Sequence, residues 1–183
     1  MFGFKKKYTE QDIIVGCQKN KRLAQQKLYK KYGNVLLGIC MRYLKDKYIA
    51  EEILTAGLLK VFEKIGQFEN KGSFEGWLRR IMVNECLMYL RKQKKEIYHQ
   101  DIENIAEEEL VEVETETTWN SEELLEMIQK LPTGYRTVFN LYAIENYTHK
   151  EIAEILNISI GTSKSQLSKA RKMLQKSLSV ISV

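Results

Sequence analysis

Apolar residues recur at spacings of three and four along almost the whole chain, and this periodicity restricts the fold more than any other feature of the sequence. A single proline among 183 residues leaves few points at which a helix must break. We find no run of strictly alternating polar and apolar residues, the pattern typical of strands. The sequence therefore predicts an all-α protein, with room for one ordinary domain or two small ones.

Charge divides the chain into three parts. Residues 1–95 hold 21 basic and 9 acidic side chains, residues 96–123 hold 11 acids and no Lys or Arg, and residues 124–183 hold 8 basic and 4 acidic side chains. Two cationic blocks on either side of an anionic connector suggest two surfaces for a polyanion. We predict a helical domain over 1–95, an acidic flexible linker over 96–120 and a second helical domain over 121–183.

The first domain is expected to contain four helices. Thr9 and Asp12 predict a capping box at the first helix, which we extend to about Leu23. Ser73 is the expected N-cap of the fourth helix, which we extend to about Lys95. The second and third are expected over about 25–43 and 48–66. Three widely spaced cysteines lie in apolar helical sequence and are expected to be buried, reduced thiols: Cys17, Cys40 and Cys86.

The second domain ends in a predicted helix-turn-helix. Asn120 with Glu123 starts its first helix, a break follows at 132–134, and another helix is expected over 135–145. Thr148 and Glu151 predict a capping box, and Asn157-Ile-Ser159 reads as the turn, with Ser159 capping the last helix. Helical spacing predicts that one set of residues of this last helix faces inward: Ile160, Ser163, Leu167, Ala170 and Leu174. The opposite side is polar and basic: Lys164, Ser165, Ser168, Lys169 and Lys172. This pattern is typical of a recognition helix in a DNA major groove.

The fourth helix of the first domain carries a polar stripe. At 100° per residue, Arg80, Asn84 and Arg91 fall within about 40° of one another, with Trp77 at the edge of the stripe. A cationic stripe bordered by an aromatic ring, beside a glycine-containing loop, suits phosphates and an unstacked base. The alternative is a core helix with a solvated edge. For Trp77 and Phe74 taken alone, that packing role is the favoured one.

Together the two regions resemble an extracytoplasmic-function (group 4) sigma factor of the sigma-70 family of bacterial RNA polymerase. The resemblance covers nearly the whole chain except its first residues and the linker. It depends on these segments, in this order: Tyr29–Leu44, Ala50–Ile53, Leu59–Phe62, Gly72–Ile81, Leu131–Tyr142, Glu151–Ala153 and Gly161–Arg171.

The resemblance implies a promoter-specific initiation factor that binds core RNA polymerase, melts and reads the −10 element, and reads the −35 element. The positions it implies at the −10 element are Lys71, Ser73, Phe74, Trp77, Arg80, Asn84 and Arg91. Those at the −35 element are Lys164, Ser165, Ser168, Lys169 and Arg171. Those on the polymerase are Glu51, Glu52, Leu59 and Phe62. The acid of the family pattern is kept at Glu52, but Thr55, Ala56 and Leu58 replace polar or aromatic residues usual there.

The implied partners are core RNA polymerase, promoter DNA and, as in many members of this family, a candidate anti-sigma factor. For the acidic linker we weigh two roles, occupation of a basic polymerase channel and a solubilising spacer. A rival to the sigma factor is a self-sufficient regulator that binds palindromic duplexes through the helix-turn-helix alone. We predict no enzymatic activity, cofactor or metal site, since no paired carboxylates, nucleophile with base, or ligand cluster is present at familiar spacing. The N-terminus lacks a signal-peptide core and no run would span a bilayer, so we predict a cytoplasmic protein without membrane insertion.

Overall fold

The computed structural model describes residues 8–97 and 120–181, and every regular element in these ranges is a helix. The chain divides into two compact units, Met1–Cys40 with Asp46–Arg91 and Met41–Lys45 with Lys92–Val183. Residues 98–119, most of the predicted linker, lie outside the described ranges. The all-α prediction is confirmed for the described residues.

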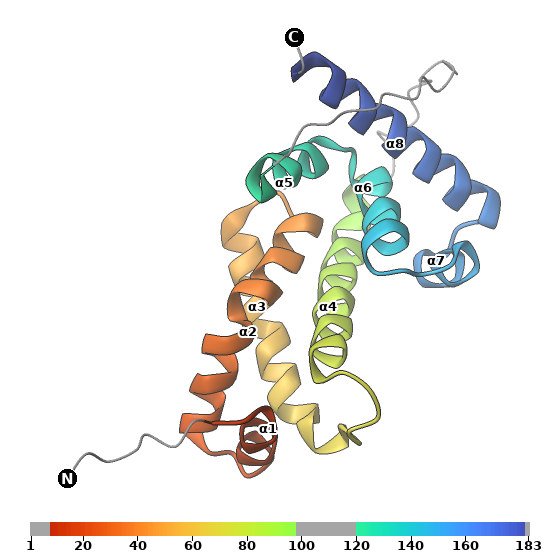
Figure 1. Cartoon of the computed structure of the whole chain (residues 1–183). Coiled ribbons are helices and arrows are strands. Elements are labelled where there is room, and N and C mark those ends of the chain that lie inside the picture. Colours follow the sequence, from red (N-terminus) through yellow and green to blue (C-terminus); the bar gives the residue numbers. More distant parts are fainter. Residues whose placement is uncertain (1–7, 98–119, 182–183) are drawn as a thin grey trace. The chain divides into compact units, whose positions relative to one another are not determined.

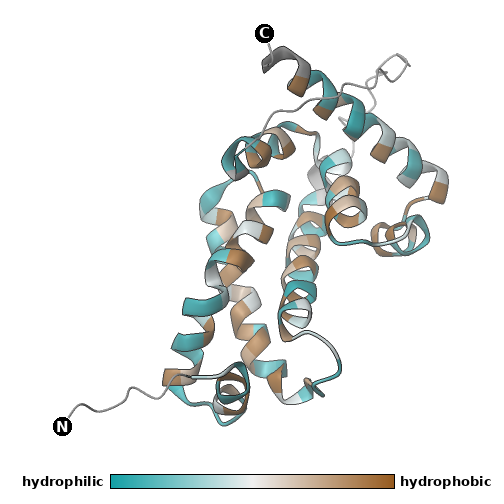
Figure 2. Cartoon of the chain, viewed as in Figure 1, coloured by the Kyte–Doolittle hydropathy of each residue, from teal (hydrophilic) through white to brown (hydrophobic). Residues whose placement is uncertain are grey.

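In the first unit, three long helices lie side by side, with a short helix at the end where the second one begins (Figure 1). Apolar and polar residues alternate around each helix (Figure 2), as burial of one face requires. The bounds of these elements are α1 Glu10–Gln18, α2 Arg22–Tyr43, α3 Lys47–Lys64, the 3₁₀ turn η1 Ile65–Gln67 and α4 Phe74–Ile97.

The predicted capping chemistry of this unit is present. Thr9 and Asp12 form a capping box at α1. The Ser73 hydroxyl accepts a hydrogen bond from the Gly76 amide at 3.2 Å, at the start of α4. Asp46 is the N-cap of α3, and its carboxylate accepts hydrogen bonds from the Tyr48 and Ile49 amides.

The predicted end of the first helix is wrong. Helix α1 ends at Gln18, and Asn20 takes a left-handed φ of 52° before α2 begins at Arg22. The reversal lets α1 and α2 approach closely: a Cβ added to Gly16 would lie 2.5 Å from the Cβ of Ala24. The apolar spacing of the sequence continues across the junction between α1 and α2, because buried residues lie on both sides of it. The spacing therefore does not mark where α1 ends.

The contact between α1 and α2 is also held by polar groups. The Tyr32 hydroxyl donates a hydrogen bond to the carboxylate of Glu10, and the Lys31 ammonium lies 3.0 Å from the same carboxylate. The hydrogen bond from Tyr32 and then the one from Lys31 lower the pKa of Glu10. All three cysteines are buried as free thiols, as predicted, and burial raises the pKa of Cys17 to about 11. The Cys17 thiol is therefore protonated and unreactive at neutral pH.

The second unit contains a helix-turn-helix preceded by two shorter helices. Its elements are α5 Ser121–Lys130, α6 Thr133–Phe139, the π-helical turn η2 Asn140–Ile144, α7 His149–Leu156 and α8 Ile160–Ile181. Asn120 with Glu123 forms the predicted capping box of α5. The single helix predicted over 135–145 instead begins at Thr133 and widens into the π-helical turn. Arg136 helps to join α5 and α6 because its guanidinium donates to the carbonyls of Gln129 and Leu131.

Candidate nucleic-acid interface

A pocket of about 360 Å³ lies at the loop between η1 and α4. The loop turns with two left-handed residues, Asn70 with φ 56° and Gly72 with φ 98°. Only glycine adopts the second of these angles without strain. The pocket is lined by Gln67, Phe68, Glu69, Lys71, Gly72, Ser73, Gly76, Trp77 and Arg80.

Aromatic rings form one wall of this pocket. Trp77 is partly exposed, and its ring is stacked on that of Phe74, with centroids 5.8 Å apart and planes at 16°. Phe68 contacts both rings, at centroid distances of 5.1 Å to Phe74 and 5.5 Å to Trp77. Tyr32 supports Phe74 edge-on at 5.7 Å. The arrangement presents Trp77 toward the surface and holds it from behind.

Phe74 does not share the partial exposure of Trp77. Only 2 % of its surface is accessible, because it lies between Tyr32, Phe68 and Trp77. In this structure its ring is therefore a packing element, in line with the packing alternative weighed from the sequence. Ser73 is exposed at the pocket, and its hydroxyl also serves as the cap of α4.

The rim of the pocket mixes charges. The exposed Lys71 ammonium lies 2.6 Å from the carboxylate of Glu69, which offsets part of its charge. Arg80 is exposed at the edge of the pocket, whereas its neighbour Arg79 pairs with Glu75 at 3.0 Å. The pocket thus has an aromatic wall and a rim in which basic side chains outnumber acidic ones.

A second groove of about 250 Å³ lies between α3 and α4, and it contains the remaining residues of the polar stripe. Asn84 and Arg91 line it from α4, and Lys60 and Lys64 line it from α3. The Lys60 ammonium pairs with Glu85 at 2.9 Å. The predicted site residues did not include these two lysines or the pocket residues Gln67 and Phe68. The four-residue spacing of the lysines in the sequence nevertheless places them on the same face of a helix.

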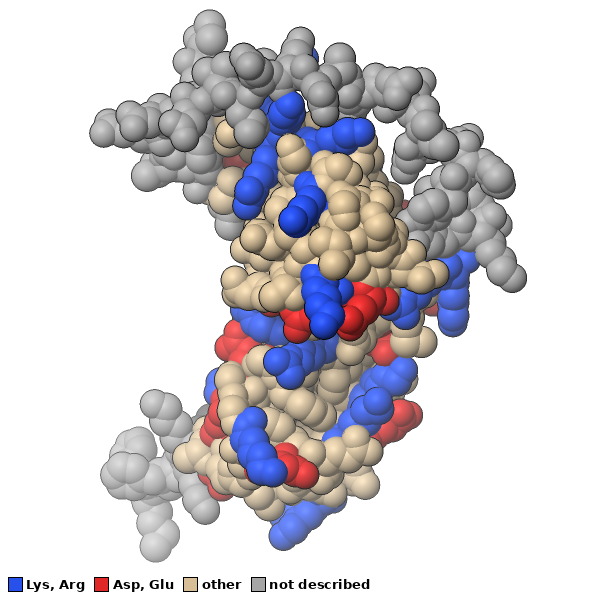
Figure 3. Space-filling view, turned by 90° about the vertical axis from the view of Figure 1, so that its right-hand side faces the viewer, with Lys and Arg blue, Asp and Glu red and all other residues tan. Residues whose placement is uncertain are grey.

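A basic surface on α8 is the second candidate interface. The capping box of Thr148 with Glu151 starts α7, Asn157 turns with a φ of 54°, and the Ser159 hydroxyl accepts from the Thr162 amide at 2.9 Å. All three features were predicted. Helix α8 contains five basic residues and no acidic one. Figure 3 shows Lys and Arg side chains over the upper part of this face with few acidic ones among them.

The inward and outward sides of α8 follow the predicted periodicity except at Ile160 and at Leu174, which is only partly buried. Ser163, Leu167 and Ala170 are buried. Ile160 was predicted to face inward but is 47 % exposed; it is the first residue of α8, so no preceding turn of the helix lies beside it. The predicted −35 residues all lie on the accessible side: Lys164, Ser165, Ser168 and Arg171 are exposed and Lys169 is partly so. The Ser165 hydroxyl donates back to the Thr162 carbonyl at 3.0 Å.

The third predicted surface lies on α3. Glu51 and Glu52 are exposed, Phe62 is partly exposed, and Leu59 leaves 60 % of its surface accessible, which is unusual for a leucine. Among the residues that depart from the family pattern, Thr55 and Ala56 are exposed, whereas Leu58 is buried. Leucine at 58 therefore belongs to the core of the unit rather than to this surface.

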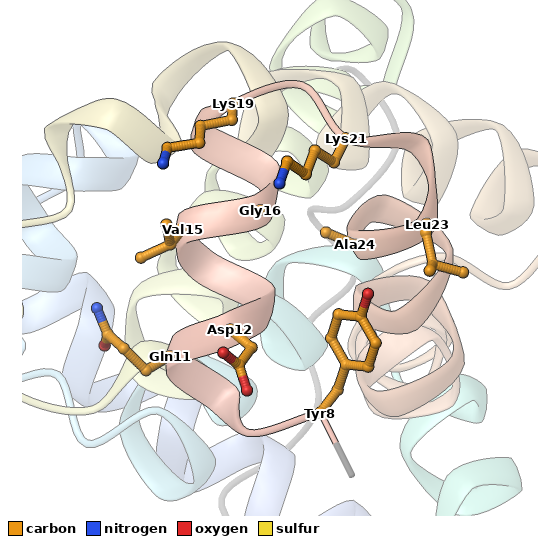
Figure 4. Close-up of a pocket in the computed structure, with 9 residues that line it drawn as sticks. All are labelled: Tyr8, Gln11, Asp12, Val15, Gly16, Lys19, Lys21, Leu23 and Ala24. Carbon is orange, nitrogen blue, oxygen red and sulfur yellow. The ribbon is translucent and has the colours of Figure 1, made fainter. Parts of the chain in front are cut away.

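A further concavity of about 440 Å³ lies between α1 and the start of α2, with no predicted site residue in it (Figure 4). Its walls carry Lys19 and Lys21 as well as Asp12, so they do not select one sign of charge. Across residues 8–97 and 120–181, no group of His, Cys, Asp and Glu has the arrangement of a metal site. None of the helices in these ranges has the length and apolar composition needed to cross a bilayer.

Comparison with known protein families gives two matches. The family model for Sigma-70 region 2 matches residues 28–96, and the model for Sigma-70, region 4 matches residues 121–174. The ECF RNA polymerase sigma factor SigW of Bacillus subtilis is 33 % identical over 159 residues, which cover 80 % of this chain and 84 % of SigW. The ECF RNA polymerase sigma-E factor of Haemophilus influenzae is 29 % identical over 178 residues, covering 91 % and 94 % of the two chains.

A solved structure shares the fold. The sigma factor RpoE of Bartonella quintana, crystallised in complex with the anti-sigma factor NepR, superposes with a TM-score of 0.52. The match covers 85 % of this chain and 96 % of that one, at 23 % sequence identity.

Proposed function

Because the chain belongs to the sigma-70 family, among its extracytoplasmic-function sigma factors, we propose that it binds core RNA polymerase and directs transcription initiation at promoters with specific −10 and −35 elements. Such a factor acts in the cell interior, where the polymerase is. It performs no catalysis of its own and supplies specificity to the enzyme that does. The observation that carries the proposal is the combination of both family regions, in family order, with an aromatic pocket in one unit and a basic helix in the other.

The proposal assigns one task to each unit. Residues 1–95 form the domain for the −10 element and the polymerase, residues 96–120 link the domains, and residues 121–183 form the domain for the −35 element. A separate site for each element allows duplex DNA and melted DNA to be bound at once, by surfaces of different shape.

At the −10 element, a base of the non-template strand leaves the duplex and enters the pocket beside Trp77. Extrusion costs a few kcal/mol, which stacking and hydrogen bonding offset. The Trp77 ring is suited to this because it is partly exposed and supported from behind by Phe74 and Phe68. Phe74 then contributes by holding Trp77. The strand's phosphates follow a polar path formed by Lys71, Ser73, Arg80, Asn84 and Arg91, which line the pocket or the adjoining groove.

At the −35 element, α8 enters the major groove. Lys164 and Arg171 contact phosphates, which supplies affinity without sequence information. Ser165 and Ser168 are short and exposed, and with the flexible Lys169 they are the residues suited to reach base edges. Exchange of these three residues for those of another family member is expected to change the preferred −35 sequence.

The polymerase contact lies on the exposed face of α3, with Glu51 and Glu52 for electrostatic pairing and Leu59 and Phe62 for apolar contact. An exposed leucine beside carboxylates is the composition of an interface that pairs with a basic, partly apolar partner surface. An anti-sigma factor is the candidate regulator, as in the solved complex of the Bartonella quintana sigma factor.

Run-off transcription tests the function. Purified core polymerase is incubated with a genomic promoter library, with and without this protein, and transcripts are mapped at their 5′ ends. The proposal expects new start sites that need both proteins and share spaced −10 and −35 sequences. The rival regulator instead predicts tight binding to palindromic duplex without polymerase. Absence of any start site that depends on both proteins would refute the sigma-factor function.

A further inference from the structure

The first turn of α8 contains a buried hydroxyl with a specific partner. Ser163 has no accessible surface, and its Oγ forms a 2.9 Å hydrogen bond with Nδ1 of His149. A buried hydroxyl without a partner is destabilising, so the hydrogen bond to the imidazole stabilises this position. Because His149 is the first residue of α7, the bond ties the start of α7 to the start of α8.

An aromatic ring extends this contact along α8. The ring of Tyr142, from the turn η2, is stacked on the His149 imidazole with centroids 4.5 Å apart and planes at 24°. The Arg171 guanidinium lies 5.8 Å from the centroid of the same Tyr142 ring. Arg171 is about two helical turns beyond Ser163. These four residues, the His149 cluster, therefore join η2, α7 and two separate turns of α8.

The charges that face the imidazole are mostly positive. Lys164 and Arg171 approach from α8, and Tyr142 approaches from η2 as a neutral ring. On α7, Lys150 follows directly, and the Glu151 carboxylate accepts hydrogen bonds from the backbone amide and hydroxyl of Thr148. Burial, and then the charges of Lys164 and Arg171, lower the pKa of His149. The imidazole is thus mainly neutral in the free protein at neutral pH.

The two cations that disfavour a proton on His149 are the same residues assigned to −35 phosphates. We propose that the His149 cluster positions α8 on the −35 duplex and takes up a proton when a DNA phosphate docks against Lys164 and Arg171. The inference rests on the proposed function and adds to it a positioning residue and a linkage to pH.

The sign of the linkage follows from the charges. A bound phosphate offsets the repulsion from Lys164 and Arg171, so His149 has a higher pKa in the complex than in the free protein. A group with the higher pKa in the bound state takes up a proton on binding. Duplex affinity therefore rises as the pH falls through the pKa that His149 has in the complex. The gain in affinity is complete below the pKa that His149 has in the free protein. Above the pKa in the complex, the gain is absent.

The test uses holoenzyme formed from the full chain and core polymerase, with a labelled promoter duplex that carries a −35 element found by run-off transcription. Fluorescence anisotropy gives the affinity between about pH 6 and pH 8, where an imidazole titrates. For the wild type we expect a gain of about three- to tenfold toward the lower pH beyond that of His149→Gln, whose amide can bond to Ser163 but cannot titrate. His99→Gln removes the other histidine of the chain and should keep the wild-type slope.

Two further variants separate positioning from titration. Tyr142→Phe keeps the ring and should retain both affinity and slope, whereas Tyr142→Leu should weaken binding and flatten the slope while circular dichroism shows a folded protein. If His149→Gln and the wild type have the same pH slope, the inference is overturned. If no variant binds any promoter with core polymerase at any pH, the proposed function itself fails.

Discussion

The two candidate DNA surfaces differ in shape, although both are basic. In the first unit a pocket opens beside a ring that is stacked on another ring. In the second unit the surface is one side of a helix whose opposite side is buried, with short and basic side chains pointing outward. A pocket can enclose a base that has left its stack, whereas a helix can enter the groove of an intact duplex.

Net charge therefore does not identify what each unit binds. Lys71 pairs with Glu69 on the rim of the pocket, so the rim attracts phosphates less strongly than its number of basic side chains suggests. Helix α8 has no acidic side chain to offset its basic side chains. Affinity for duplex should therefore depend mainly on α8, and selectivity for melted DNA mainly on the aromatic wall.

Loss of the aromatic wall is expected to have the largest effect. Trp77→Ala removes the stacking platform, and stacking contributes about 1–3 kcal/mol per base, so binding of melted −10 DNA should weaken about five- to 150-fold. Trp77→Phe retains a ring on Phe74 and should lose less. Fluorescence of 2-aminopurine in the non-template −10 strand reports the extruded base. Equal base extrusion by Trp77→Ala and the wild type would show that the pocket is not the base site.

Neutralisation of α8 comes next. Replacement of Lys164 and Lys169 by Ala should make holoenzyme binding to duplex promoter less dependent on salt. The slope of log affinity against log salt concentration should become shallower by about 0.9 for each phosphate that the variant no longer neutralises. Binding to promoter DNA that ends before the −35 region, and so cannot reach α8, should stay unchanged. Lys150→Ala together with Lys130→Ala, which removes two charges of the same unit outside α8, is the matched control. A salt slope reduced as much by the control would place the phosphate-binding residues elsewhere.

A smaller effect is expected from the loop that forms the pocket. Gly72→Ala puts a side chain at a φ of 98°, and strain at such a position costs about 1–3 kcal/mol. Since a Cβ at Gly72 would meet no other atom within 4 Å, the effect should come from the backbone alone. Promoter opening, followed by permanganate reactivity of melted thymines, should slow. Gly66→Ala, at a glycine in η1 whose Cβ would also meet open space, should have no such effect.

The smallest effect is expected at the start of the helix-turn-helix. Thr148→Ala removes the cap of α7 and should lower the free energy of unfolding of its unit by about 1 kcal/mol, measured by urea denaturation. Thr148→Ser keeps the accepting hydroxyl and should retain most of that stability. An unchanged unfolding midpoint in Thr148→Ala would show that the cap hydrogen bond contributes nothing measurable.

Local chemistry made much of this fold predictable from the sequence. The caps at Thr9, Ser73, Asn120, Thr148 and Ser159 depend on side chains within three residues of the amides they bond, so a linear pattern contains them. The buried side of α8 followed from its periodicity except at Ile160, where the helix begins, and at the partly buried Leu174.

Features that depend on contacts between helices could not be read from the sequence. The π-helical turn at 140–144 has no side-chain pattern that separates it from an α-helix, and the end of α1 depends on the close approach of Gly16 to Ala24. The groove that joins Lys60 and Lys64 to Asn84 exists only because α3 packs on α4. The sequence indicated a stripe on one helix, and packing makes it one wall of a groove.

Two promoter templates can show whether each unit reads one promoter element. Holoenzymes are formed with the wild-type protein, with Trp77→Ala, or with the α8 variant Lys164→Ala and Lys169→Ala. Each is bound to a fork template that has melted −10 DNA and ends before the −35 region, and to a duplex that has the −35 element and no −10 sequence. We predict that Trp77→Ala weakens binding only to the fork and that the α8 variant weakens binding only to the duplex. Equal losses by both variants on both templates would contradict the account.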